Sequence, residues 1–168
     1  MPPREARKFG SRKMSEFLEW RNEWTLDSEE MDEDHRILAE MLNRIAECDG
    51  SVHSGRACER GEAPPSRASM LALLGEFGQH VRAHFLREEA FMRDIHYPYL
   101  TSHKGEHDLL MAEYAELMRK IQARGTEYLD LHMLKALKDW LIGHVLESDR
   151  QLAAFYHQVW AAAEKEGS

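Results

Sequence analysis

The chain has few cysteines, no long apolar run and little positive charge, and each of these absences excludes a class of protein. It has only two cysteines, Cys48 and Cys58, in 168 residues, too few for the disulfide framework of a small secreted scaffold. No apolar run reaches the roughly 18 to 20 residues of a membrane span, and the N-terminus lacks the apolar region of a signal peptide. We therefore expect a cytoplasmic protein with free thiols and no membrane contact; a loop disulfide between the two cysteines is the alternative.

Positive charge is also in short supply. The formal net charge is -8, the isoelectric point is near 5.7, and no stripe of lysine and arginine occurs. Binding to a phosphate backbone needs such a stripe. We therefore exclude nucleic acid as a partner.

What the chain does contain is helical periodicity. With 43% hydrophobic residues it is long enough for one domain with a substantial core. Apolar residues recur at helical spacing in four long segments, and residues 49–66 between the first two are rich in Gly and Pro, as in a loop insertion. The predicted helices run from about Glu30 to Glu47, from Ala68 to Asp94, from a cap at Thr101 or Ser102 to Gly125, and from Tyr128 to Val145. Residues 152–163 form a further short helix or a continuation of the fourth.

Four helices with mostly short connections predict an all-α, antiparallel up-and-down four-helix bundle. We expect residues 1–13 to be a flexible N-terminal tail and residues 14–164 to be the bundle, ending in the short C-terminal helix. A lead-in segment precedes the first helix and is expected to pack on the bundle through its large apolar residues, Phe17, Leu18, Trp20 and Trp24.

Five histidines and two carboxylates stand out because of their spacing. Residues four apart lie above one another on a helix face, so His84/Glu88 and His103/His107 each project two donors in the same direction. His35 lies on the first predicted helix, and His144, followed by Asp149, comes from the fourth. All four helices therefore contribute to one cluster of candidate metal ligands, which are His35, His84, Glu88, His103, His107, His144 and Asp149.

The donor set narrows the metal chemistry. Seven donors are too many for one ion, and a structural zinc site would need four, commonly with cysteine among them. Ferritin-like bundles use mostly glutamates and a three-residue Glu-x-x-His spacing, which this chain lacks. Imidazole with carboxylate suits iron among several first-row metals. If both carboxylates and a solvent oxygen bridge two irons, one iron has six ligands and the other has five, which leaves a position for a small diatomic molecule.

These residues resemble the motifs of bacterial hemerythrins over roughly residues 24–155. The resemblance is carried by Met31-Asp32-Glu33-Asp34-His35-Arg36-Ile37-Leu38, His84-Phe85-Leu86-Arg87-Glu88-Glu89, Tyr97-Pro98 followed by His103-Lys104-Gly105-Glu106-His107, and Trp140-Leu141-Ile142-Gly143-His144 with Asp149. It implies two non-haem iron ions bridged by Glu88, Asp149 and an oxo or hydroxo group. It gives His103, His107 and His144 to the saturated iron, His35 and His84 to the open one, and an oxygen pocket to Phe85, Trp140, Leu141 and Val145.

The function that the resemblance implies is reversible O₂ binding for carriage, storage or delivery, rather than enzymatic turnover. Two alternatives stay open. One is sensing of O₂ or redox state, and the other is a di-iron enzyme that reduces peroxide or nitric oxide. Nitric oxide and other small diatomics are alternative ligands, and no protein partner is indicated.

The chain departs from the family pattern in two places. The segment from Trp24 to His35 is shorter than usual and lacks the family's glycine, and residues 49–66 lengthen the first connection. The remaining histidines have no such pattern. We expect solvent exposure or ordinary packing for His53, His96, His132 and His157, and also for His80, whose position one turn before His84 makes it a candidate for a supporting contact.

Overall fold

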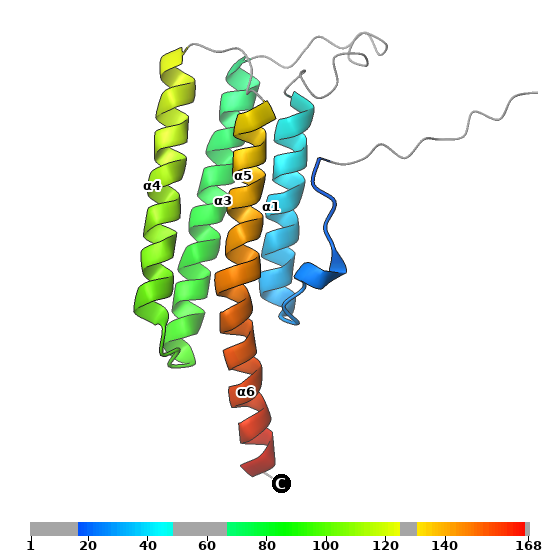
Figure 1. Cartoon of the computed structure of the whole chain (residues 1–168), viewed down its shortest axis with the longest axis vertical. Coiled ribbons are helices and arrows are strands. Elements are labelled where there is room, and N and C mark those ends of the chain that lie inside the picture. The colour runs from blue at the N-terminus through cyan, green and yellow to red at the C-terminus, as the bar shows by residue number, and fades with distance from the viewer. Residues whose placement is uncertain (1–16, 49–66, 125–130, 167–168) are drawn as a thin grey trace, which may run out of the picture.

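Long helices make up most of the chain that the computed structural model describes, which is residues 17–48, 67–124 and 131–166 (Figure 1). The bundle helices are α1 (Glu29–Cys48), α3 (Arg67–Asp94), α4 (Leu100–Arg124) and α5 (Leu131–His144). A 3₁₀ turn, η1 (Asn22–Trp24), precedes them, and a π-helical turn, η2 (Val145–Asp149), joins α5 to α6 (Arg150–Glu166). These ranges contain no strand, and the predicted all-α four-helix bundle is confirmed.

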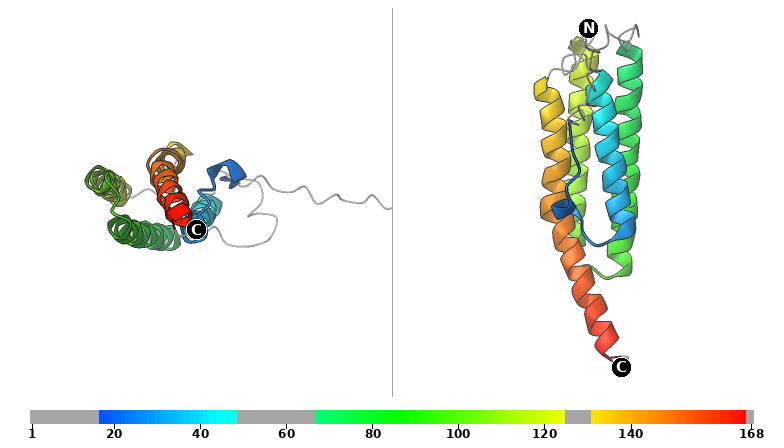
Figure 2. Two further views of the ribbon diagram at one scale, coloured as in Figure 1. Left: turned by 90° about the horizontal axis from the view of Figure 1, so that it is seen from below. Right: turned by 90° about the vertical axis from the view of Figure 1, so that its right-hand side faces the viewer.

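Successive bundle helices alternate in direction (Figure 1). Helix α1 packs against both α3 and α5, and α3 packs against α4. Both side views show α6 running past the ends of the other helices (Figures 1 and 2). None of the helices in the described ranges combines the length and the hydrophobicity that a membrane span requires.

The core is divided into two apolar clusters. The larger one holds the buried residues of one half of the bundle, including Leu42, Ile45, Leu74 and Phe77, each essentially without exposure. The smaller one, at the other end, contains Leu26, Met31, Met92, Tyr97, Leu152 and Ala153. Burying a single Leu or Phe side chain contributes about 1.5–3 kcal/mol, so both clusters hold the helices firmly in register.

A polar layer lies between these clusters. Along α1, His35 falls between Met31 of the smaller cluster and Leu38 of the larger. Along α3, Glu88 falls between Phe85 and Met92 in the same way. The candidate ligands therefore occupy a polar layer with one apolar cluster toward each end of the bundle.

The lead-in segment packs on the bundle as predicted. Leu18 and Trp24 are buried in the larger cluster, and Phe17 and Trp20 pack against it. The segment is anchored to α1 by a reciprocal pair of hydrogen bonds. The Leu18 N–H donates to Asn43 Oδ1 at 2.7 Å, and Asn43 Nδ2 donates to the Leu18 carbonyl at 2.9 Å.

The helix boundaries differ from prediction at two points. Thr101 and Ser102 do not cap α4 but lie inside its first turn, where Ser102 Oγ donates to the Tyr99 carbonyl at 2.9 Å. The fourth helix does not end at Val145, because η2 carries it into α6 without a break. The predicted tail at 1–13, the insertion at 49–66, Cys58 and the predicted end at Gly125 lie outside the described residues.

Candidate metal centre

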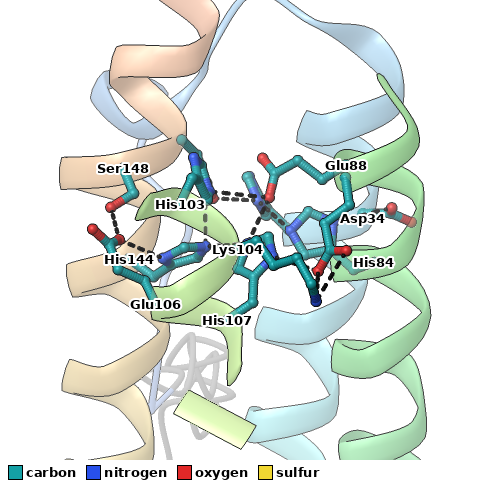
Figure 3. A network of polar contacts seen from close by, with 12 residues as sticks. Asp34, His84, Glu88, His103, Lys104, Glu106, His107, His144 and Ser148 are labelled. Carbon is teal, nitrogen blue, oxygen red and sulfur yellow. Dashed lines mark hydrogen bonds and ion pairs between the residues drawn. The ribbon is translucent and has the colours of Figure 1, made fainter. Parts of the chain in front are cut away.

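The seven predicted donors meet in the polar layer of the bundle. Helix α1 supplies His35, α3 supplies His84 and Glu88, α4 supplies His103 and His107, α5 supplies His144, and η2 supplies Asp149. None of them is more than 8% exposed. Figure 3 shows how the side chains from α3, α4 and α5 point toward one another.

The donors form two groups that share Asp149. One group is Glu88, His103, His107, His144 and Asp149, and the other is His35, His84 and Asp149; within each, the donor atoms lie within 4.8 Å of one another. Asp149 Oδ2 lies 3.1 Å from His35 Nε2, while its Oδ1 lies 3.0 Å from His144 Nε2. The two oxygens of one carboxylate thus face different groups, as a bridging ligand requires. Glu88 belongs only to the larger group, so a bridging role for Glu88 stays a prediction.

Several buried donor atoms of the cluster lack a hydrogen-bond partner, although His35 Nε2 lies 3.2 Å from His84 Nε2 and His107 Nε2 lies 3.1 Å from His144 Nε2. Glu88 Oε2 lies 3.0 Å from His107 Nε2, and Asp149 Oδ1 lies 3.3 Å from His103 Nε2. Nevertheless, both oxygens of each carboxylate and His103 Nε2 are buried without a hydrogen-bond partner in the described part of the chain. Buried polar atoms are almost always satisfied. Carboxylate oxygens and imidazole nitrogens that converge on common points, several of them without a hydrogen-bond partner, are typical of a metal site, so the residues fit a pair of cations.

The electrostatics of the cluster also favour cations. Burial raises the pKa of the Asp149 carboxyl, but the imidazoles of His144, His103 and His35 outweigh it and hold that pKa well below its usual range. Burial lowers the pKa of His103, yet Asp149 and Glu88 raise it to about 9. The carboxylates therefore keep their negative charge, which needs positive charge beside it.

Three further carboxylates support the outward-facing nitrogens of the histidines. His84 Nδ1 donates to Asp34 Oδ2 at 3.3 Å, and His107 Nδ1 donates to Glu89 Oε1 at 3.4 Å. His144 Nδ1 lies 3.9 Å from Glu106 Oε2. A carboxylate on Nδ1 fixes the ring orientation and leaves Nε2 free to bind a metal.

These supporting carboxylates follow one rule of placement. Each of them is adjacent in sequence to a donor residue on its own helix, but it contacts a histidine on the next helix. Asp34, for example, precedes His35 on α1 and contacts His84 on α3. Glu89, next to Glu88, reaches His107, and Glu106, next to His107, reaches toward His144. The site is therefore tied together from α1 through α3 and α4 to α5.

Surface cations hold two of the supporting carboxylates in place. Arg87 donates from Nη2 and Nε to Asp34 at 2.7 and 3.0 Å. Burial raises the pKa of Asp34, but His84 and Arg87 outweigh it and lower that pKa to about 2. Lys104 Nζ lies 3.4 Å from both oxygens of Glu89, and Ser148 Oγ donates to Glu106. Asp34, Glu89 and Glu106 entered the sequence analysis only as parts of the family motifs, and their supporting role beside the histidines was not predicted.

Apolar side chains close the cluster from the larger core. Phe85 is 5% exposed and stacks on the His107 ring, with centroids 3.8 Å apart and planes at 7°. Leu141 and Val145 are also buried in this core. Trp140 is half-buried, and its ring centroid lies 6.4 Å from that of Phe85.

The other histidines stay outside the cluster. His80, His96, His132 and His157 are exposed, as expected, so His80 gives no support to His84. His157 Nε2 donates to the Leu26 carbonyl at 3.0 Å, and its ring centroid lies 5.6 Å from that of Tyr156. His53 lies outside the described residues.

A helical bundle that buries five histidines and two carboxylates between apolar layers defines a histidine-rich dinuclear metal protein. Residues 26–156 match the family model described as Hemerythrin HHE cation binding domain, and the chain belongs to the hemerythrin family. It is 26% identical over 137 residues to a bacteriohemerythrin of Stenotrophomonas maltophilia, covering 82% of this chain and 80% of that protein. A bacteriohemerythrin of Ralstonia nicotianae is 25% identical over 151 residues, covering 90% and 97%.

The fold agrees with solved hemerythrin structures. The crystal structure of a hemerythrin point mutant superposes with a TM-score of 0.67 at 21% identity, covering 83% of this chain and 97% of that one. The hemerythrin domain binds O₂ at a non-haem di-iron centre, and the donor set described above fits two such ions.

Proposed function

We propose that the protein binds O₂ reversibly at its pair of iron ions, in the cytoplasm, for carriage, storage or delivery of oxygen. The observation that carries this proposal is the division of the buried donors into a group of five and a group of three that share Asp149. An ion in the first group would have nearly all the protein ligands it can take, whereas an ion in the second would have few.

This division supports the ligand assignment that the family resemblance implies. His103, His107 and His144 would hold the first ion together with Glu88 and Asp149, and His35 and His84 would hold the second together with Asp149. Glu88 would be the second carboxylate shared by the two ions. When bound, the ion pair supplies two electrons and one vacant coordination position, which suit O₂ and, as alternatives, nitric oxide and other small diatomics.

The protein's own task is to keep the surroundings of the second ion dry. Phe85, Leu141 and Val145 are at most 5% exposed and have no ionisable group. With Trp140, we assign them to the wall of the oxygen pocket. An apolar wall excludes the water and protons that would promote irreversible oxidation of the centre.

The outer carboxylates orient the ligands. With Nδ1 of His84 and His107 engaged by Asp34 and Glu89, both rings present Nε2 to the cluster. These outer contacts therefore hold both ligands in the orientation that metal binding requires.

Visible absorption of the iron-loaded protein tests this proposal. The protein is reduced without oxygen, exposed to O₂, and then deoxygenated over several cycles. A band that appears with O₂ and disappears on its removal supports reversible binding. Steady consumption of O₂, peroxide or nitric oxide by a protein that never develops this band would replace the carrier with an enzyme.

A further inference from the structure

A groove of about 490 Å³ separates α4 from α5 on the outside of the bundle. Its floor is apolar and includes Leu110, Leu117, Leu137 and Trp140. At its edge, Leu109 is 60% exposed, unlike most large apolar residues of the bundle. The groove has the volume of a typical ligand site, and exposed apolar surface of this kind usually marks a binding site.

The rim of this groove carries negative charge only. Glu106, Glu113 and Glu147 line it, and no lysine or arginine does. Within the described ranges, the side chains of Glu113 and Glu147 pair with no cation. An occupant with an apolar side chain and several positive charges would match both the floor and the rim.

We propose that the groove binds the protein's own N-terminal segment, residues 1–16. This segment has five lysines and arginines (Arg4, Arg7, Lys8, Arg12 and Lys13) against two glutamates, in a chain whose net charge is -8. Phe9 stands in the middle of these cations and supplies an apolar side chain for the floor. The lining and the segment are therefore complementary in both charge and hydrophobicity.

The point where the described chain begins makes this binding possible. The Phe17 carbonyl accepts from Lys138 Nζ at 3.4 Å, and the same ammonium group lies 5.4 Å from the centre of the Phe17 ring. Lys138 follows Leu137 of the groove floor directly, so residue 17 lies beside the same turn of α5. An α-helix is about 10 Å wide, and the eight residues from Phe17 back to Phe9 span up to about 26 Å, enough to pass around α5.

A second groove offers an internal comparison. It lies between the lead-in segment and α1 and is lined by Leu18, Trp20, Arg36, Glu40, Arg44 and Glu47, among others. Its two arginines balance its two glutamates, so it has little attraction for a basic segment. The negative charge of its rim therefore makes the groove between α4 and α5 the better binding site for the basic N-terminal segment.

The groove also lies next to the metal cluster, because His144, Ser148 and Glu106 line one end of it. The inference itself concerns the polypeptide alone and does not depend on the proposed oxygen binding.

Zero-length cross-linking of the full chain with a carbodiimide tests the placement. The reagent joins a lysine to a carboxylate only where they form a close pair. In monomers isolated by gel, peptide mapping should find Lys8 or Lys13 joined to Glu106, Glu113 or Glu147. Links to Glu40 or Glu47 instead would overturn the proposal, and links found only between two chains would replace the N-terminal segment with a second copy.

Limited trypsin digestion gives an independent measurement. The double variant Glu113→Gln/Glu147→Gln should be cleaved at Arg7 to Lys13 roughly two- to tenfold faster than wild type, because two exposed ion pairs are lost. The matched variant Glu40→Gln/Glu47→Gln loses the same charge beside the other groove and should be cleaved at the wild-type rate. Equal rates in all three proteins, without the expected cross-links, would show that the groove does not hold this segment.

Discussion

His144 and Asp149 lie on the same face of one continuous helix, with His144 Nε2 and Asp149 Oδ1 3.0 Å apart. In an α-helix, five residues make about 1.4 turns, and the two side chains would point in different directions. The π-helical turn Val145–Asp149 changes this, because hydrogen bonding between residues five apart places them above one another. One irregular turn thus positions the carboxylate that both donor groups share.

We therefore expect Asp149→Asn to release iron from both positions. The substitution keeps the shape of the side chain but removes the charge and one of the two oxygens that face the groups. Iron content measured after gel filtration should fall to about half of wild type or less. Asp139→Asn, at an exposed position of α5, is the matched control and should keep its iron. Equal iron in the two variants would refute the bridging assignment.

The supporting carboxylates should affect metal affinity in a graded order. Replacing Asp34 with Asn or Glu89 with Gln should weaken iron binding by roughly 10- to 100-fold, as loss of such partners typically does. Glu106→Gln should have the smallest effect, because Glu106 is half-exposed and lies 3.9 Å from His144 Nδ1. Competition with a coloured iron chelator measures these affinities. Glu33→Gln, which pairs only with Arg36 on the surface, should match wild type, and a larger effect at Glu106 than at Asp34 would contradict the order.

Two glycines of α3 should respond to alanine in opposite directions. A Cβ at Gly78 would lie 2.4 Å from the Tyr114 ring, whereas a Cβ at Gly75 would meet nothing within 4 Å. Gly78→Ala should lower the free energy of unfolding by roughly 1–3 kcal/mol, because the Tyr114 hydroxyl is tied to the Leu74 carbonyl and the ring cannot move freely. Gly75→Ala should raise it by about 0.5–1 kcal/mol. Urea unfolding followed by circular dichroism measures both, and effects of the same sign would contradict this packing.

His96 lies two residues after the end of α3, in a backbone conformation that favours glycine. Its φ is 54°, and the Tyr97 N–H donates to the Met92 carbonyl at 2.8 Å, as in a Schellman cap. His96→Gly should raise the free energy of unfolding by about 1 kcal/mol and the melting temperature by roughly 2–4 °C. His132→Gly, on the exposed face of α5, should lower it slightly because glycine is a poor helix former. A lower melting temperature for His96→Gly would show that the ring makes a stabilising contact.

Local spacing was sufficient to predict most of the site. His84 with Glu88 and His103 with His107 stand one turn apart, and regular helices bring each pair to one face without help from tertiary structure. The bundle then follows from the apolar periodicity of α1, α3, α4 and α5, whose predicted bounds lie within a few residues of those observed.

What sequence reasoning could not supply depends on irregular backbone and on contacts between helices. A continuation of the fourth helix was one of two predicted alternatives for residues 152–163, but the π-helical turn that carries it was not predicted, because no residue type marks such a turn. The supporting role of Asp34, Glu89 and Glu106 was not predicted because each contacts a histidine on another helix, and charged residues at such positions ordinarily face solvent. Similarly, Thr101 or Ser102 was predicted to cap the third helix because Thr and Ser are common N-caps, but α4 already begins at Leu100.

The ratio of iron to protein in the folded chain tests the central claim most directly. Seven buried donors in two groups that share Asp149 should hold two ions, so protein expressed with ample iron should contain two irons per chain by elemental analysis. The double variant His35→Ala/His84→Ala, which keeps the group of five, should contain one. One metal per wild-type chain, or zinc in place of iron, would contradict the account.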